Sequence, residues 1–422
     1  MSTRPLYYFL GKCQKVRQEA PQAGEILIHY ITMKQSILNP NNLQTFAKEH
    51  KLQPFRVKQI IQEIYDNQNI RFEDMTTLSK DLRQQLDENF EILSIIPETI
   101  LESEDNIKIG FKTHDNFTIE AVILFHRSKH EKESIKSKVH KVESQNKGPD
   151  DLTTLGPDRP LNRITLCVSS QIGCPVNCVF CVTGKLGIKR DLTRNEIISQ
   201  LLFANNFIKT KFGKKDDQTL RAVRNVVFMG MGEPLINYQN VKKSIEIMIA
   251  QAGGFSLGKR HITISTAGII PGIEQLIKDD IPVKLAISLH APNQKLREEL
   301  MPIAKVYTLD KLMKTIDDYV KVSDNRIFYE YIMIKNKTDK PELATQLADL
   351  LHGRLAHVNL IPYNMNPAIK LEESDERTIR AFKDILEKKG ITVTIRDSLG
   401  RDLKSACGQL GYEKIANRHC EE

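Results

Sequence analysis

The sequence lacks long apolar runs, and no stretch approaches the roughly 20 residues that a membrane-spanning helix needs. Residues 1–10 contain a short apolar patch but no small-residue cleavage site, so we expect no secretory signal peptide. Acidic residues are fewer than basic ones, 53 against 61, which gives a formal net charge of +8. These features predict a cytoplasmic, non-membrane protein, and the charge favours a polyanionic partner without establishing one.

Cysteine is sparse outside one short stretch of the chain. The seven cysteines are Cys13, Cys167, Cys174, Cys178, Cys181, Cys407 and Cys420. An odd number, clustered in one place in a chain of 422 residues, does not fit the disulfide framework of a small secreted domain. The pattern indicates a reducing compartment with metal-binding or catalytic thiols. We assign no role to Cys13 or Cys420.

Three of these cysteines, Cys174, Cys178 and Cys181, lie within eight residues, in a segment where Gly173 and Pro175 permit a tight loop. Thiolates select zinc, copper(I) or iron–sulfur clusters. No second Cys-x-x-Cys follows that would complete a four-thiolate zinc site. A cubane cluster normally has four cysteine ligands, so three would leave one iron open to a small molecule. A three-cysteine zinc site with a distant histidine, or an unligated trio, remains an alternative.

Two segments before this loop, residues 39–100 and 101–126, differ in the spacing of their apolar residues. Residues 39–100 carry apolar residues three and four apart, which predicts a helical module. Residues 101–126 alternate apolar and polar positions, which predicts a β-hairpin with its turn at residues 114–116. Glu120 lies on the second strand, opposite in parity to the apolar positions. The module also carries basic residues that suit either a solvated face or a polyanionic partner: Lys51, Arg56, Lys58, Arg71, Lys80 and Arg83.

From Ile164 the chain alternates short apolar strand-like runs with helical stretches, which predicts an α/β fold with a parallel sheet. The expected strands are 164–168, 225–229, 261–265, 283–288, 327–334, 357–361 and 391–395. Helices are expected at 194–207, 241–250, 271–278, 309–320 and 342–351. Polar residues and glycines follow the strand ends, where a site is expected in barrel folds: Gly232, Glu233, Ser265, Ser288, His290 and Asn364. A serine at a strand end is also an ordinary cap, and a single histidine is often structural.

The three cysteines, with Phe180 just before the last, resemble the signature of radical S-adenosylmethionine (SAM) enzymes. The longer string from Cys167 to Cys174 is similar to that of the RNA adenine C2-methyltransferase family (RlmN), to which the C8-methylating enzymes (Cfr) are related. The resemblance covers residues 40–415. It implies a partial (β/α)6 barrel at 161–415 behind an N-terminal helical accessory domain that helps to hold RNA. Residues 1–38 form an extension of uncertain role, and residues 416–422 a tail.

The resemblance also implies a set of site residues. Cys174, Cys178 and Cys181 would hold one [4Fe-4S] cluster, and Cys407 would carry an S-methylcysteine intermediate. Cys167 would resolve the RNA–protein thioether and end in a transient disulfide with Cys407. Glu120, in the motif Glu120-Ala-Val, would be the proton acceptor, although Cys167 is an open alternative for that role. The positions implied to bind SAM are Gly232, Glu233, Ser265, Ser288, Leu289, His290 and Asn364.

The implied reaction is methylation of adenine C2 in the peptidyl-transferase region of 23S rRNA and just 3′ of tRNA anticodons. It would use two SAM molecules per turnover, a flavodoxin-type electron donor and a monomeric enzyme. One alternative is C8 methylation by the same chemistry, against which Pro234 argues. Another is a non-catalytic iron–sulfur or zinc RNA-binding relative, which would have no need of Cys167 and Cys407. The polar stretch 127–160, expected to be a flexible insertion, departs from the family's short bridge.

Overall fold

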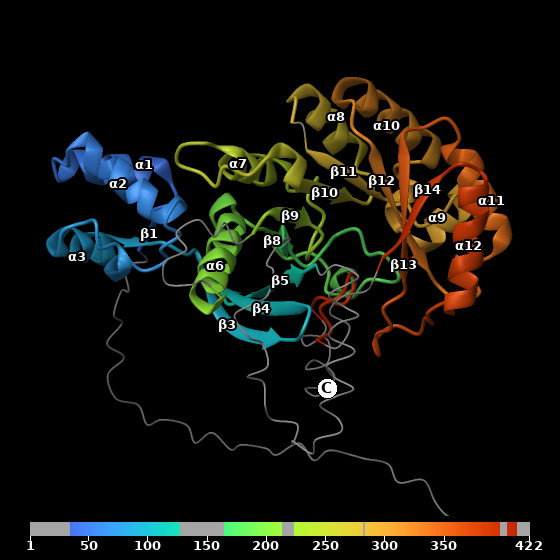
Figure 1. The fold of residues 1–422 in the computed structure, drawn as a ribbon, viewed down its shortest axis with the longest axis horizontal. Helices are drawn as coiled ribbons and strands as arrows, with labels where there is room; N and C mark the ends of the chain where they lie inside the picture. Colours follow the sequence, from blue (N-terminus) through green and yellow to red (C-terminus); the bar gives the residue numbers. More distant parts are fainter. Residues whose placement is uncertain (1–33, 127–163, 213–222, 282, 397–402, 412–422) are drawn as a thin grey trace, which may run out of the picture. The chain divides into compact units, whose positions relative to one another are not determined.

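The computed structural model describes residues 34–126, 164–212, 223–281, 283–396 and 403–411 (Figure 1). The chain divides into two units, residues 1–34 and 35–422, and all of the elements below belong to the second. Most of the extension, the insertion at 127–160, the tail at 416–422, Cys13 and Cys420 lie outside the described residues. In the ranges that are described, no helix is long and apolar enough to cross a bilayer.

The first elements are three short helices, α1 (Pro40–Glu49), α2 (Pro54–Tyr65) and α3 (Lys80–Asn89). A proline in the first turn of α1 and of α2 suits that position because its missing N–H has no partner there anyway. The side chain of Ser79 caps α3 by accepting from Leu82 N. Each helix buries its apolar stripe, as the 3.6-residue period predicted. The short strands β1 (Gln35–Ser36) and β2 (Phe90–Glu91) pair in parallel beside them.

A ten-stranded sheet follows, in the order β14-β13-β12-β11-β10-β9-β6-β5-β4-β3. Its antiparallel part consists of β3 (Ile95–Glu102), β4 (Asn106–Thr113) and β5 (Thr118–Phe125). The parallel part consists of β6 (Ile164–Cys167), β9 (Asn225–Phe228), β10 (Ile262–Thr266), β11 (Lys284–Ser288), β12 (Ile327–Met333), β13 (Ala356–Pro362) and β14 (Thr392–Ile395). All seven expected parallel strands are confirmed to within about one residue.

Helices connect each parallel strand to the next, so that six strand–helix units precede the last strand, β14. They are α6 (Arg194–Phe212), α7 (Tyr238–Ile249), α8 (Ile270–Lys278), α9 (Gln294–Leu300) with α10 (Leu309–Ser323), α11 (Pro341–Leu351) and α12 (Glu376–Lys388). The sequence predicted the first three, α10 and α11. It did not single out α9, which has only seven residues, or α12.

The strand β3 lies inside the range that the sequence assigned to the helical module. Two features hid it from the sequence pattern. Pro97 interrupts the run, and the register with β4 shifts between Pro97 and Thr99. Because β3 is an edge strand, it also leaves apolar side chains such as Ile96 and Ile100 exposed, so one face is not sharply marked. The expected hairpin is therefore the last two strands of a three-stranded antiparallel unit.

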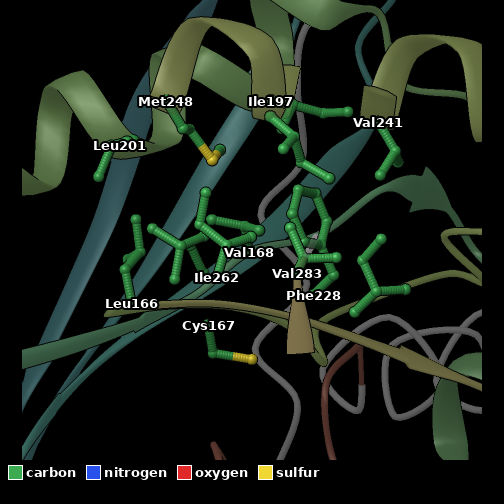
Figure 2. Packing of buried hydrophobic residues seen from close by; sticks show 14 of the residues in the cluster. Leu166, Cys167, Val168, Ile197, Leu201, Phe228, Val241, Met248, Ile262 and Val283 are labelled. Carbon is green, nitrogen blue, oxygen red and sulfur yellow. The ribbon is translucent and has the colours of Figure 1, made fainter. Parts of the chain in front are cut away.

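Alternation along the strands gives the sheet one strongly apolar face. Leu166 and Val168 point toward α6 and α7, where they meet Ile197 and Met248, while the Cys167 thiol points to the opposite face (Figure 2). The strand register repeats this sorting, because Leu166 pairs with Val226, which in turn pairs with Ile262. The helices thus cover the apolar face, and Cys167 marks the other face, called here the inner face.

The inner face is polar. Val122 pairs with Cys167, so Glu120 shares its face by the two-residue period, and so does Lys108, which pairs with Val122. On the parallel side, Ser288 pairs with Glu330, and Glu330 with Asn359. The sheet curves around this face, because Arg396 Nη1 after β14 lies 3.8 Å from Met229 Sδ after β9. A flat sheet would separate strands five positions apart by roughly 24 Å.

An ion-pair network with one buried member, Glu196, fastens the antiparallel turn to α6. Arg190 in β8 (Arg190–Asp191) contacts Asp115 with Nε at 2.6 Å and Nη2 at 2.8 Å, and Glu196 with Nη1 at 2.9 Å and Nη2 at 2.8 Å. Glu196 is buried and also accepts from Thr193 N. Hydrogen bonding to Arg190 lowers the pKa of Asp115.

We predict that Arg190→Met lowers the free energy of unfolding at pH 7 by about 2 kcal/mol, because it leaves the buried Glu196 carboxylate without its charged partner. Because the folded pKa of Asp115 is lowered, its ionised carboxylate stabilises the fold above the unfolded pKa of about 4, and that contribution is lost as the pH falls. The gap between the variant and the unsubstituted chain should therefore narrow below about pH 4. Urea titrations at several pH values measure it.

Lys335→Met is the matched control, because Lys335 pairs with Glu372 at 2.8 Å on the surface, where both side chains are largely exposed. It should change the free energy of unfolding by less than about 0.5 kcal/mol. Equal stability of the Arg190 variant and this control would contradict the network's role.

Candidate active site

The cysteine loop, residues 173–182, turns through two residues with positive φ, Gly173 at 77° and Asn177 at 53°. A Cβ on Gly173 would lie 1.7 Å from the backbone oxygen of Gly187, so no other residue fits there. Two backbone hydrogen bonds dock the loop on distant segments. Val179 N donates to Leu300 O at 3.0 Å, and Val182 N donates to Gly408 O at 2.9 Å.

A second hydrophobic core lies beneath this loop, where the parallel strands end. Its residues come from the ends of four neighbouring strands, from the end of α9 and from the loop itself: Val176, Phe180, Ala267, Ala291, Leu300, Met301, Ile332, Ile334 and Tyr363. The three loop cysteines are half-buried and pack against it. The loop therefore covers the carboxyl ends of β10 to β13, as a site at the strand ends requires.

The three thiols are neighbours that affect one another. Burial raises the pKa of Cys174 to about 12, and burial followed by the charges of Cys181 and Cys174 raises that of Cys178. In the described ranges, no group of three or more His, Cys, Asp or Glu side chains is already arranged to hold a metal ion. The donor set still suits a soft metal centre, because such a centre binds thiolates and would displace the protons that burial retains.

The glycine turn after β9 packs against the start of the cysteine loop. Gly232 has a φ of 102°, and a Cβ there would lie 2.7 Å from Gln171 N. Ser170 N and Gln171 N both donate to Met231 O, and Glu233 N donates to the Gln171 side chain at 2.8 Å. The glycine is thus required by contact between two protein segments, a reason that the sequence did not reveal.

Glu233 is buried and ties this turn to the end of β10. Its carboxylate accepts from Ala267 N at 2.7 Å and from Leu235 N at 3.1 Å. Burial raises its pKa to about 7, which those hydrogen bonds oppose. The Thr266 side chain also hydrogen-bonds this carboxylate, so one of its four lone-pair positions remains for a ligand donor such as an ammonium group.

The other predicted SAM contacts follow the next strands. Ser265 and Ser288 lie half-buried on the inner face of β10 and β11, and Leu289 N donates to Glu330 O. His290 has a φ of 58° and accepts from Ile332 N through Nδ1 at 3.2 Å. Its ring meets Phe180 edge-on at 4.8 Å. Burial lowers its pKa to about 3, so the ring is neutral at pH 7 and joins the cysteine loop to β12.

The segment 403–411 brings the second predicted catalytic thiol to the inner face. Asn364 Nδ2 donates to Cys407 O at 3.1 Å, so this asparagine holds the thiol's backbone. Cys407 is exposed, whereas Cys167 is buried. Burial is the main cause that raises the pKa of Cys167, and the charge of Cys407 is the second. Burial also raises the pKa of Cys407, and the positive charge of Arg396 opposes that rise. An accessible thiol surrounded by protein is consistent with a place inside the curved sheet.

The antiparallel strands anchor this segment directly. Glu120 Oε2 accepts from Gly411 N at 2.8 Å, and its other oxygen lies 3.4 Å from Lys108 Nζ in a buried ion pair. Ser405 Oγ donates to Asn106 Oδ1 at 2.9 Å. Glu120, Lys108 and Asn106 all lie on the inner face by register. The sequence placed Glu120 in the site, but it gave no sign of these contacts with residues near the C-terminus.

Sequence reasoning missed three buried polar residues at the strand ends. Glu330 on the inner face accepts from Asn359 Nδ2 at 2.8 Å, and Arg297 and Tyr363 belong to the segments beneath the cysteine loop. No motif marked them, since each is defined by burial and by partners that are distant in sequence. From sequence alone, the basic residues that follow the cysteine loop, Lys185, Lys189, Arg190 and Arg194, could hold phosphates or form a solvated face. In the structure Arg190 binds Asp115 and Glu196, and Arg194 binds Leu38 O and Asn195 Oδ1. Lys185 and Lys189 are exposed.

Comparisons with known proteins agree with this geometry. A model of the radical SAM superfamily matches residues 168–347, and one of the ribosomal RNA large subunit methyltransferase N-terminal domain matches residues 37–92. A Dictyoglomus turgidum protein named "Probable dual-specificity RNA methyltransferase RlmN" is 40% identical over 366 residues, which are 86% of this chain and 92% of that protein. The chain belongs to the RlmN family of radical SAM RNA methyltransferases.

Further relatives support the assignment over the whole fold. A Clostridium tetani protein of the same name is 35% identical over 386 residues, covering 91% of this chain and 97% of its own length. The crystal structure of a radical SAM methyltransferase from Sphaerobacter thermophilus superposes with a TM-score of 0.76 at 32% identity, over 90% of this chain and 99% of that one. These matches confirm the predicted α/β fold class and the resemblance to RlmN enzymes.

The RlmN family implies SAM and a [4Fe-4S] cluster as cofactors. The site's residues fit both groups. Three soft donors share one loop, the Glu233 carboxylate has spare acceptor capacity, and the Arg297 guanidinium beneath the loop has buried N–H groups with no protein partner in the described residues. A bound cluster of this kind supplies an electron for reductive cleavage of SAM.

We predict that Gly232→Ala weakens SAM binding at least tenfold and lowers the free energy of unfolding by about 2 kcal/mol, because the new Cβ collides with Gln171 at a positive φ. Calorimetric titration with SAM and thermal unfolding measure the two effects. Gly353→Ala is the control, since Gly353 has a φ of 73° but open space around it. It should cost about 1 kcal/mol of backbone strain and leave SAM affinity unchanged. Normal SAM binding by the Gly232 variant would contradict the turn's role.

We predict that Ser405→Ala loosens the segment 403–411, because the bond to Asn106 is lost. A loss of about 1 kcal/mol of local stability corresponds to roughly fivefold faster amide exchange. Hydrogen exchange with mass spectrometry measures this, with Ser94→Ala as a control that removes a comparable bond, to Ser36 Oγ, elsewhere. Unchanged exchange in 403–411 would show that other contacts suffice to fix the segment.

Proposed function

We propose that this enzyme methylates C2 of adenine in RNA, in the peptidyl-transferase region of 23S rRNA and at the adenine 3′ of tRNA anticodons. The observation that carries the proposal is the arrangement of the two predicted catalytic thiols. Cys167 projects from β6 onto the inner face, and segment 403–411 is anchored to the same face through Asn106 and Glu120. The dual-specificity name of the relatives supports the two RNA substrates.

In this proposal each thiol has a distinct task. Adenine C2 is not nucleophilic, so a methyl group cannot pass to it by direct displacement from SAM. The accessible Cys407 thiolate first receives the methyl group, with Asn364 holding its backbone. After hydrogen-atom abstraction, the resulting carbon radical adds to C2 and links RNA to Cys407, and the adduct gives up one electron, which the oxidised cluster would accept. Burial raises the pKa of the Cys167 thiol, so a base must first remove its proton. The Cys167 thiolate then attacks the Cys407 sulfur; the carbon–sulfur bond breaks, the released carbon takes up a proton to become the methyl group of the base, and a disulfide remains.

The group that removes the C2 proton is either Glu120 or Cys167. Glu120 is held by Lys108 Nζ and by Gly411 N, so one oxygen of its carboxylate is already committed to anchoring the thiol segment. Val122 of β5 pairs with Cys167 of β6, and Glu120 lies two residues before Val122. Glu120 and Cys167 therefore lie on the same face of two neighbouring strands. We retain Glu120 as the proton acceptor, in a role that it combines with positioning Cys407.

The helical module supplies a plausible RNA contact. Its exposed lysines Lys51, Lys58 and Lys80 face solvent, and Phe55 is half exposed with the Arg56 guanidinium 4.7 Å from its ring centre. Basic side chains bind phosphates, and exposed aromatic rings stack on unpaired bases. Two other arginines of the module contact Glu73 instead. Arg71 pairs with the Glu73 carboxylate, and Arg83 donates to the Glu73 backbone oxygen. We further propose a cytoplasmic monomer, a flavodoxin-type reductant and two SAM molecules per turnover.

Nucleoside mass spectrometry tests the proposal. Reconstituted enzyme would receive SAM, a reductant and either a 23S rRNA fragment or tRNA under anaerobic conditions. We expect 2-methyladenosine, and the RNA that carries it identifies the substrate. Appearance of 8-methyladenosine would support the C8 alternative instead, and an intact cluster with SAM cleavage but no methylation of either RNA would refute the proposed substrates.

The same assay separates the thiol roles. Cys407→Ala should keep its iron and sulfide content yet form no methyladenosine, because the methyl group has no acceptor. Cys167→Ala should accumulate a covalent protein–RNA adduct that survives denaturing electrophoresis, because nothing resolves the thioether. The adduct should be absent when both cysteines are replaced. A Cys167→Ala enzyme with normal turnover would contradict the two-thiol mechanism.

A further inference from the structure

Two residues beneath the cysteine loop, Arg297 and Tyr363, and one on the inner face of β12, Glu330, contain buried polar atoms that have no hydrogen-bond partner among the described residues. Glu330 can reduce the cost of its unpaired oxygen by binding a proton, and burial indeed raises its pKa. Arginine stays charged at neutral pH, and a tyrosine hydroxyl keeps its proton. Arg297 and Tyr363 therefore carry donors that only an acceptor can satisfy.

Arg297 on α9 is fully buried. Its Nη2 donates to Ala267 O at 2.7 Å, but Nε and Nη1 have no partner in the described residues. Leu300, three residues further on and hence on the same side of the helix, accepts from Val179 N of the cysteine loop. Burial lowers the pKa of Arg297 only to about 10, and the nearby Cys178 opposes that change. A buried cation thus lies beside the loop, and no carboxylate of the described residues forms an ion pair with it.

Tyr363 follows β13 and is 1% exposed. It belongs to the second hydrophobic core, which the three loop cysteines pack against, and its hydroxyl has no partner in the described residues. Burial and then the charge of Cys181 raise its pKa to about 12. The hydroxyl therefore stays protonated and lies within electrostatic reach of a second loop cysteine. The two donors that lack a partner among the described residues thus approach the loop from different elements, Arg297 from α9 and Tyr363 from the end of β13.

We propose that Arg297 and Tyr363 donate hydrogen bonds to the sulfur atoms of the iron–sulfur centre that the cysteine loop holds, Arg297 on the Cys178 side and Tyr363 on the Cys181 side. The acceptor is an anionic, sulfur-rich metal centre, whose thiolates and sulfides accept N–H and O–H groups. This inference depends on the family assignment, which provides the cluster. It explains why the protein keeps two buried donors that cost stability when they have no acceptor.

Such donors set the reduction potential. The reduced cluster carries one more negative charge than the oxidised cluster, so donors and a nearby cation stabilise the reduced form more strongly. Removing either residue should therefore make the cluster harder to reduce. Arg297 should have the larger effect, because it contributes a full charge in a buried place.

The first test uses Tyr363→Phe, which removes one hydroxyl and leaves the ring. A potentiometric titration of the reconstituted, SAM-free enzyme, followed by electron paramagnetic resonance, should show a reduction equilibrium constant about tenfold lower, or about 59 mV for one electron. The cluster-free variant should unfold at the same temperature as the unsubstituted chain or slightly above it, because no hydrogen bond is lost. Arg297→Met should shift the potential further, and Arg297→Lys, which keeps the charge, should shift it less.

Two controls match these substitutions. Tyr331→Phe removes a buried hydroxyl that donates to Thr338 O at 2.9 Å, so it should lower the unfolding temperature and leave the potential unchanged. Arg354→Met removes an arginine paired with Asp317 just before β13, at the opposite end of the strands from the loop. It too should leave the potential unchanged. Tyr363→Phe should thus change the reduction potential but not lower the unfolding temperature, whereas Tyr331→Phe should lower the unfolding temperature but not change the potential.

Unchanged potentials in both the Tyr363 and Arg297 variants would overturn the inference. A loss of SAM affinity with an unchanged SAM-free potential would also overturn it, because the donors would then serve the SAM carboxylate. An unsubstituted chain that assembles no cluster, by iron and sulfide analysis, would refute the proposed function itself and the inference with it. A folding failure of Arg297→Met leaves the Tyr363→Phe measurement decisive.

Discussion

The two-residue alternation along the strands is the constraint on which the site depends. Leu166 and Val168 point into the helices, so Cys167 between them must point the other way. Strand pairing passes this sorting across the sheet, and Glu120, Ser288, Glu330 and Asn359 fall on the face of Cys167 without any local instruction. A shift of one residue in any strand would exchange the apolar and polar faces, so the same register that builds the core also builds the site.

A polar face of this kind is stable only if its groups find partners, and the curvature of the sheet supplies many of them. Glu330 meets Asn359 on the next strand, and Arg396 reaches Met229 across the interior. The segment 403–411 adds partners from the far end of the chain, since Gly411 N satisfies Glu120 and Ser405 binds Asn106. The same two hydrogen bonds therefore anchor the segment that carries Cys407 and satisfy buried polar groups of the sheet. A reactive residue on such a segment is positioned without a helix or strand of its own.

The sequence predicted what depends on local pattern. The parallel strands are continuous apolar runs, and the cysteine spacing lies within one loop, so both could be read residue by residue. The strand β3 was missed because Pro97 and an exposed edge weaken its alternation. Arg297 and Tyr363 could not be predicted, because an unpartnered donor is defined by everything around it. The role of Arg190 could not be predicted for the same reason, since its partners Asp115 and Glu196 come together only when the turn packs against α6.

The buried donors beneath the cysteine loop lower the stability of the cluster-free protein at positions where the proposed chemistry needs them. A methionine or phenylalanine at these positions would suit a hydrophobic core better than a guanidinium or a hydroxyl that has no partner among the described residues. Burial also raises the pKa of Cys174 and of Cys178, which disfavours the thiolate anions that could compensate for Arg297. Both costs disappear together when thiolates bind a metal centre, because the same event removes the protons and provides acceptors. Loading the centre is thus coupled to the stability of the strand ends that surround it.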